Sequence, residues 1–169
     1  MKQVLTLMAL LLCTYWGIAQ QKAQPVKVDY TKKGAALPHF YINKTDGGYI
    51  IPQLLKKGKP VMIMIFSPEC DHCGVVLDSI KTIREKFKTT QVILVAEERH
   101  KDKMVGFIEK EEIKNDPLFK NIGTNKGELI AAIYTNKILP QIVFYDANHK
   151  LVKILDGHYS LADIAPYVK

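Results

Sequence analysis

Two cysteines separated by two residues are the side chains best suited to chemistry in this sequence of 169 residues. Cys70 and Cys73 enclose Asp71 and His72, and Glu69 precedes them. A thiolate is the nucleophile of thiol–disulfide exchange, and a second cysteine nearby can displace the mixed disulfide that the first one forms. The same spacing also supplies half of a zinc site. The motif therefore predicts either redox chemistry or metal binding.

The sequence offers no clear further ligands that could complete a metal site with the two cysteines. A structural zinc site needs four ligands, and no second cysteine pair is present. The histidines outside the motif are scattered without ligand spacing, and we interpret them as surface or loop residues: His39, His100, His149 and His158. We therefore expect no metal at the cysteine pair and no cofactor.

A buried strand and a helix are predicted to position the cysteines. Residues 61–66 are six consecutive apolar residues that follow the breaker Gly58-Lys59-Pro60, which is typical of a fully buried strand. A helix is expected from Cys70 or Asp71 to about Phe87, because one face of that segment is apolar: Val76, Ile80, Ile83 and Phe87. Cys70 would then lie in the first turn, where a helix favours negative charge, and Cys73 on the inward face.

The remaining segments alternate between strand and helix patterns. Two short strands, 39–42 and 49–51, flank the turn Asp46-Gly47-Gly48 and predict a hairpin. Further elements are expected as a strand at 91–95, helices at 101–112 and 125–134, strands at 141–145 and 151–155, and a short closing helix capped by Ser160. This order predicts an α/β fold, with a central mixed sheet, helices on both faces and an N-terminal β-hairpin extension.

The segment 1–19 has the pattern of a secretory signal peptide. Lys2 gives a basic start, Val4 to Trp16 is an uncharged and mostly apolar run, and Gly17-Ile18-Ala19 is a small-x-small cleavage pattern. We expect export across the inner membrane to the periplasm or another extracytoplasmic space, with no stable membrane insertion after cleavage. A lipidated Cys13 and a leader retained as an anchor are the alternatives.

The segment 20–36 is polar and predicts a flexible lead-in to a single domain at 37–169. The composition, 47% hydrophobic and 24% charged, is that of a globular protein and excludes a disordered chain. The net charge of +7 is spread along the sequence without a nucleic-acid-binding motif, so we expect no nucleic-acid partner. After leader cleavage only the motif cysteines remain, and a bridge between them would constrain little of the unfolded chain. A chemical role explains the pair better than a structural one.

A second segment completes a recognisable pattern. Leu139 and Pro140 stand directly before a predicted buried strand in the C-terminal part of the chain. In combination with the cysteine motif, they make the sequence resemble the thioredoxin superfamily, and most closely its secreted TlpA/ResA-like thiol–disulfide oxidoreductases, over residues 37–169. The resemblance implies a thioredoxin-like fold with Cys70 as the attacking cysteine and Cys73 as the resolving one. It further implies a cis-proline loop at Leu139 and Pro140 that faces the cysteines and, with Glu69, contacts the substrate.

Two positions depart from that family. Glu69 stands where the family usually has tryptophan, and Met64 stands where thioredoxin has a buried acid. Glu97 or Glu98, after the second buried strand, could replace that acid in proton transfer.

His72 stands where DsbA-like oxidases carry a histidine that stabilises the cysteine thiolate. By this resemblance His72 belongs to the catalytic site, although the charges of Glu69 and Asp71 would oppose a thiolate. The alternative is a partly exposed helix residue without a tuning role.

The resemblance implies an envelope thiol–disulfide oxidoreductase, with reduction of partner disulfides favoured over oxidation. Its partners would be protein dithiol or disulfide substrates and an upstream membrane thiol reductase or oxidase. Two alternatives remain open: a thioredoxin-like binding module or copper carrier, since thiolates select soft metals, and a peroxiredoxin-like peroxidase. Ser67 fits the peroxidase motif, but Ile63 occupies its proline position.

Overall fold

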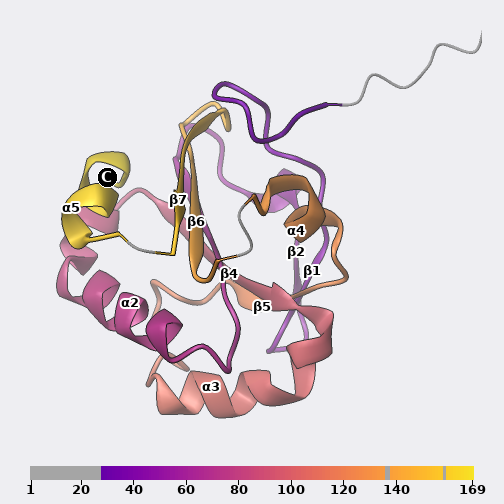
Figure 1. Cartoon of the computed structure of the whole chain (residues 1–169), viewed down its shortest axis with the longest axis vertical. Coiled ribbons are helices and arrows are strands. Elements are labelled where there is room, and N and C mark those ends of the chain that lie inside the picture. The colour runs from indigo at the N-terminus through magenta and orange to yellow at the C-terminus, as the bar shows by residue number, and fades with distance from the viewer. Residues whose placement is uncertain (1–27, 136–137, 158) are drawn as a thin grey trace, which may run out of the picture.

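The computed structural model describes residues 28–135, 138–157 and 159–169. Within these ranges the strands are β1 (Ile42–Lys44), β2 (Tyr49–Ile50), β3 (Val61–Ile65), β4 (Gln91–Glu97), β5 (Ile122–Asn125), β6 (Gln141–Tyr145) and β7 (Leu151–Asp156). They form one sheet in the order β2-β1-β5-β4-β3-β6-β7 (Figure 1). Strands β3, β4 and β5 are parallel, whereas β1, β2, β6 and β7 add antiparallel pairs. The predicted mixed sheet with a hairpin extension is confirmed.

Helices cover both faces of the sheet. The α-helices of the described residues are α2 (Asp71–Thr82), α3 (Met104–Lys110), α4 (Glu128–Ile133) and α5 (Leu161–Ile164). Short 3-10 helices are found at Pro52–Leu54, Arg84–Phe87, Glu98–Lys103 and Ala165–Tyr167. In Figure 1, α2 and α5 lie on one side of the sheet and α4 lies on the other. The thioredoxin-like α/β arrangement predicted from the sequence is therefore confirmed.

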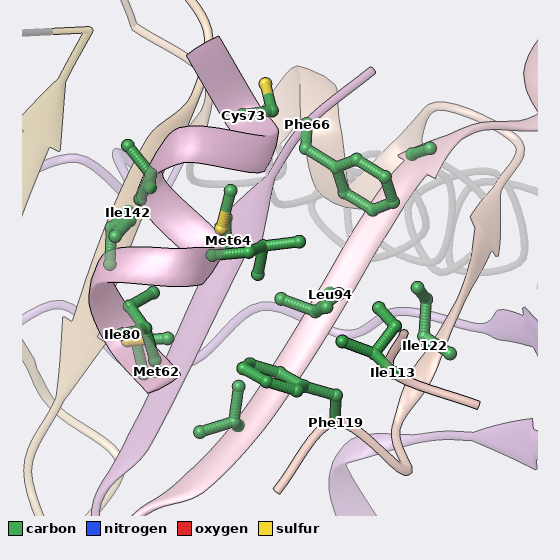
Figure 2. Close-up of a cluster of buried hydrophobic side chains, with 14 of the residues drawn as sticks. Met62, Met64, Phe66, Cys73, Ile80, Leu94, Ile113, Phe119, Ile122 and Ile142 are labelled. Atoms are coloured by element: carbon green, nitrogen blue, oxygen red, sulfur yellow. The ribbon is translucent and has the colours of Figure 1, made fainter. Parts of the chain in front are cut away.

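The alternation of side chains along the central strands divides the core into two clusters. Met62 and Met64 of β3 point to the face covered by α2, α3 and α5, whereas Ile63 and Ile65 point to the face covered by α4. All residues of β3 are buried, as expected for a strand covered on both faces. Figure 2 shows the first cluster, with Cys73 at its edge on helix α2.

Strand β5 was not predicted, and the helix expected at 125–134 is shorter. Asn125 belongs to β5, and α4 begins only at Glu128. The segment Ile122–Asn125 has a single large apolar residue, so its strand character depends on its neighbours. Gly123 is needed there because a Cβ atom would lie 2.1 Å from the backbone oxygen of Asn43 in β1.

Two predicted helices also end or begin differently. The helix expected up to Phe87 ends as α2 at Thr82, and a separate 3-10 helix follows it. The helix expected at 101–112 is a 3-10 helix over Glu98–Lys103 that continues as α3. In both cases the apolar periodicity is correct, but it does not distinguish one continuous helix from two consecutive helical segments.

The predicted signal peptide at 1–19 lies outside the described residues, as does the first part of the lead-in. The described part of the lead-in is attached to the last hairpin: the N–H of Gly34 donates to the oxygen of Leu151 at 2.8 Å, and Ala36 forms a bridge with Lys150. Within the described ranges, no helix is both long and apolar enough to cross a membrane.

Candidate active site

Cys70 lies at the junction between β3 and α2, where it is the N-cap residue of the helix. A turn brings it there: the N–H of Cys70 donates to the oxygen of Ser67 at 3.1 Å, and the N–H of Glu69 donates to Oγ of Ser67 at 3.2 Å. The Cys70 side chain is half-buried and its thiol is free. This helix start supplies partial positive charge beside an accessible sulfur, which suits a nucleophilic thiolate.

Cys73 lies one turn further along α2 and is fully buried, also as a free thiol. Its N–H donates to the oxygen of Cys70 at 2.9 Å. Burial raises the pKa of the Cys73 thiol far above its usual range, and a hydrogen bond with Cys70 raises it further. The two thiols therefore differ as an attacking and a resolving cysteine must: one is accessible, and the other is enclosed and protonated.

The peptide bond between Leu139 and Pro140 is cis and leads into β6. This loop is bonded to the segment after β7: the N–H of Gly157 donates to the oxygen of Pro140 at 3.0 Å, and the hydroxyl of Tyr159 lies 3.3 Å from the same oxygen. Leu139 and Cys70 both pack against the core cluster of Figure 2. The tertiary structure thus brings the proline loop and the cysteine pair to one end of the sheet.

His72 connects these two parts directly. Its Nε2 lies 2.9 Å from the backbone oxygen of Gly157. A carbonyl oxygen only accepts hydrogen bonds, so Nε2 is the donor. One of the two residues between the cysteines is therefore bonded to the segment whose Gly157 also bonds to Pro140.

Glu69 is engaged within the protein. Its carboxylate bonds to Lys103 Nζ and lies 3.3 Å from Nδ1 of His100. The hydrogen bond and charge of Lys103 lower the pKa of Glu69, with a smaller contribution from His100. These contacts attach the residue before Cys70 to the Glu98–Lys103 helix. His100 is buried, so its interpretation as a surface or loop histidine was wrong; its environment is set by the packing of that helix against the motif.

No sequence pattern indicated that Tyr134 and Tyr159 would be influenced by the cysteines. Burial raises the pKa of Tyr159, and the charges of Cys73 and Cys70 raise it further. Tyr134, at the end of α4, is less buried; burial again raises its pKa, and Glu97 and both cysteines add to the effect. Aromatic residues are common in cores, and only the fold brings these two within range of the cysteine charges.

The two acids that the sequence analysis considered for proton transfer are engaged with other residues. Glu97 pairs with Arg99 at 2.7 Å, and Glu98 accepts a hydrogen bond from Thr124 at 2.6 Å. Glu111, which the sequence analysis did not select, is buried at the end of α3, and its carboxylate lies against Gly74, the residue after Cys73. Within the described residues, no group of three or more His, Cys, Asp or Glu side chains is arranged to hold a metal ion.

No protein-family model and no curated protein matches this sequence. Solved structures of similar fold include a secreted disulfide oxidoreductase of Mycobacterium tuberculosis homologous to E. coli DsbE, with a TM-score of 0.61, 18% identity, and coverage of 76% of this chain and 93% of that one. A putative thiol:disulfide interchange protein DsbE from Chlorobium tepidum has a TM-score of 0.64 and 21% identity, and the match covers 78% of this chain and 89% of that one. A putative protein disulfide isomerase from Bacteroides thetaiotaomicron has a TM-score of 0.66 and 19% identity, and the match covers 80% of this chain and 87% of that one. These similarities confirm the thioredoxin-like fold.

Proposed function

We propose that this chain is an extracytoplasmic thiol–disulfide oxidoreductase that exchanges disulfides with partner proteins through Cys70 and Cys73. The observation that carries the proposal is the pairing of an accessible thiol at the start of α2 with a buried thiol one turn away, beside a cis-proline loop. The similar solved structures, which are named as disulfide oxidoreductases and interchange proteins, support the same reaction class.

The reaction proceeds by two exchanges. The Cys70 thiolate attacks one sulfur of a substrate disulfide, which forms a mixed disulfide and releases the first substrate thiolate. Cys73 then loses its proton and attacks the Cys70 sulfur, which forms the Cys70–Cys73 disulfide and releases the second substrate thiolate. Both released thiolates take up protons, so the substrate gains two electrons and two protons from the dithiol. The backbone beside Leu139 would pair with an extended substrate segment.

Reduction of the partner is the favoured direction. A thiolate that the protein stabilises makes the disulfide form oxidising, as in DsbA. Here burial opposes ionisation of Cys73. This feature disfavours the ionised dithiol and so favours electron donation.

A membrane thiol reductase upstream would then regenerate the dithiol, with an oxidase as the alternative. The location outside the cytoplasm follows from the predicted leader at 1–19, and cleavage can be checked from the N-terminal residue of the exported protein. Glu69, with its side chain engaged by Lys103, would contribute to substrate contact through the shape of the loop before Cys70.

Trapping tests the proposal. A Cys73→Ala variant, expressed with its own leader, should accumulate mixed disulfides with partner proteins, whereas Cys70→Ala and the double variant should capture none. The purified wild-type dithiol should reduce a protein disulfide, and its redox potential should lie nearer to the about −270 mV of thioredoxin than to the about −120 mV of DsbA. If the Cys73→Ala variant traps no partner and the wild-type dithiol reduces no protein disulfide, the proposed oxidoreductase activity is rejected. Retention of copper(I) by the reduced protein without turnover would favour the metal-carrier alternative.

A further inference from the structure

Cys70, the attacking thiol of the proposed exchange, stands between two acidic residues, Glu69 and Asp71. Both side chains reach solvent: Glu69 is 55% exposed, and Asp71 is fully exposed. A negative charge beside a thiol disfavours its thiolate, and the thiolate is the reactive form. The attack therefore depends on whether cations of the fold compensate these two charges.

Two lysines from consecutive helical segments pair with these carboxylates. Lys103, the last residue of the 3-10 helix after β4, bonds through Nζ to Oε1 of Glu69. Lys110, the last residue of α3, has its Nζ 3.7 Å from Oδ1 of Asp71 and 3.8 Å from Oε1 of Glu111. The contact with Asp71 is longer than a hydrogen bond and is shared with a second acid, so the stronger compensation lies at Glu69.

Glu69 is held through its backbone and through both carboxylate oxygens. Its N–H donates to Oγ of Ser67 at 3.2 Å, and Oε2 lies 3.3 Å from Nδ1 of the buried His100. A carboxylate oxygen only accepts hydrogen bonds, so Nδ1 is the donor there, while Lys103 binds the other oxygen. The hydrogen bond from Lys103 is the first cause that lowers the pKa of Glu69. The carboxylate is thus ionised at neutral pH and has a defined orientation.

The core fixes the two segments that carry this ion pair. Met104, directly after Lys103, is buried, as is Phe107 in the next turn. The ring of Phe107 lies 4.7 Å, centroid to centroid, from the ring of Phe66, which Figure 2 labels at the end of β3. The loop that carries Glu69 and the helix that carries Lys103 are therefore joined by packing beneath the ion pair.

We propose that Lys103 is a positioning residue of the exchange, which holds the Glu69 carboxylate on the helix after β4 and compensates its charge, so that Cys70 ionises beside a neutral ion pair. The inference rests on the proposed function and adds to it the residue that sets the reactivity of the attacking thiol. Other ionisable groups that act on Cys70 or Glu69, or follow them in the chain, are Asp71, Cys73, Arg99, His100, Tyr134 and Tyr159.

Alkylation of Cys70 by iodoacetamide at neutral pH, in a Cys73→Ser background, tests the proposal. The reagent carries no charge, so its rate follows the thiolate fraction of Cys70. Lys103→Met should slow the reaction by about twofold to fivefold, and Glu69→Gln should accelerate it by a similar factor, as expected for one exposed charge nearby. Lys101→Met is the matched control, since Lys101 is exposed on the same helix without an ion pair among the described residues; its rate should be unchanged.

The double variant Glu69→Gln/Lys103→Met separates charge compensation from a purely structural role. It removes both charges and should return the rate close to that of the parent, whereas loss of a structural contact would leave it as slow as Lys103→Met. Salt at about 1 M should also reduce the differences between the single variants, because it screens exposed charges. Shifts of both single variants in the same direction, a double variant that stays slow, or differences that salt does not reduce would overturn the inference.

The same variants distinguish this inference from the proposed function, because alkylation requires no protein substrate. If wild-type protein reduces disulfides but the alkylation rates of the variants do not differ, the role of Lys103 alone is rejected. If wild-type protein reduces no protein disulfide, the proposed function itself fails.

Discussion

The imidazole Nε2 of His72 lies 2.9 Å from the backbone oxygen of Gly157, so one of the two residues between the cysteines is bonded to the segment that follows β7. Gly157 in turn donates its N–H to the oxygen of Pro140. The cysteine motif and the proline loop, which are distant from each other in the sequence, are therefore linked through a single residue.

Replacement of His72 by alanine tests that link. We expect the reduced protein to lose about 0.5–1.5 kcal/mol of stability, the usual net contribution of one hydrogen bond, measured by urea unfolding with a reductant present. His39→Ala, at an exposed loop position, serves as the control and should change little. Unchanged stability in His72→Ala, together with a higher pKa of Cys70, would instead support the thiolate-stabilising role.

The two thiols should differ strongly in reactivity. Cys70 is half-buried at the helix start, whereas Cys73 is fully buried with a raised pKa. Because alkylation requires an accessible thiolate, a brief pulse of iodoacetamide at neutral pH should modify Cys70 faster by more than about tenfold. Peptide mass spectrometry identifies the alkylated cysteine. The variants Cys70→Ser and Cys73→Ser give the alkylation rate of the one motif thiol that remains in each. Equal or preferential labelling of Cys73 would contradict the assigned roles.

The stability of the reduced protein should fall at alkaline pH. Folded Cys73 holds its proton more tightly than in the unfolded chain, where the pKa is near 9.0. Its contribution is thus fully present below that pH and is lost as the pH rises toward the folded-state pKa. Wild type should lose about 1.4 kcal/mol more than Cys73→Ala between about pH 8 and about pH 10. Urea unfolding at the two pH values measures this difference.

The comparison with Cys73→Ala isolates the thiol from other alkaline titrations. Tyr145 and Tyr159, whose pKa values burial raises above the usual 10.0, act in the same direction at higher pH but are present in both proteins. Parallel stability curves for the two proteins would mean that Cys73 is not held as a neutral buried thiol.

Gly123 should be essential for the pairing of β1 with β5. A Cβ atom there would lie 2.1 Å from the oxygen of Asn43 and 2.8 Å from Cγ2 of Ile42, so Gly123→Ala should destabilise the protein by about 1–3 kcal/mol through overpacking. Gly106→Ala in α3 is the matched control, because its position is open; it should stabilise by about 0.5–1 kcal/mol. Similar unfolding midpoints for both variants would argue against this close approach of the strands.

The sequence by itself determined the elements whose signals are local. The apolar run of β3, the helix start at Cys70 and the final pair of strands were all predictable, because burial on both faces and helix periodicity are written in neighbouring residues. The spacing of the cysteines, with a proline before β6, indicated the fold and the reaction class.

Only the tertiary structure decided the environment of those residues. The strand character of β5 depends on the fit of Gly123 against β1, and His100 is buried because its helix packs at the motif. The positions of Glu111 beside Gly74 and of His72 beside Gly157 join segments that the sequence keeps well apart. Burial and charge at the dithiol arise from such contacts, which no local pattern encodes, and they hold the Cys73 thiol in its protonated form.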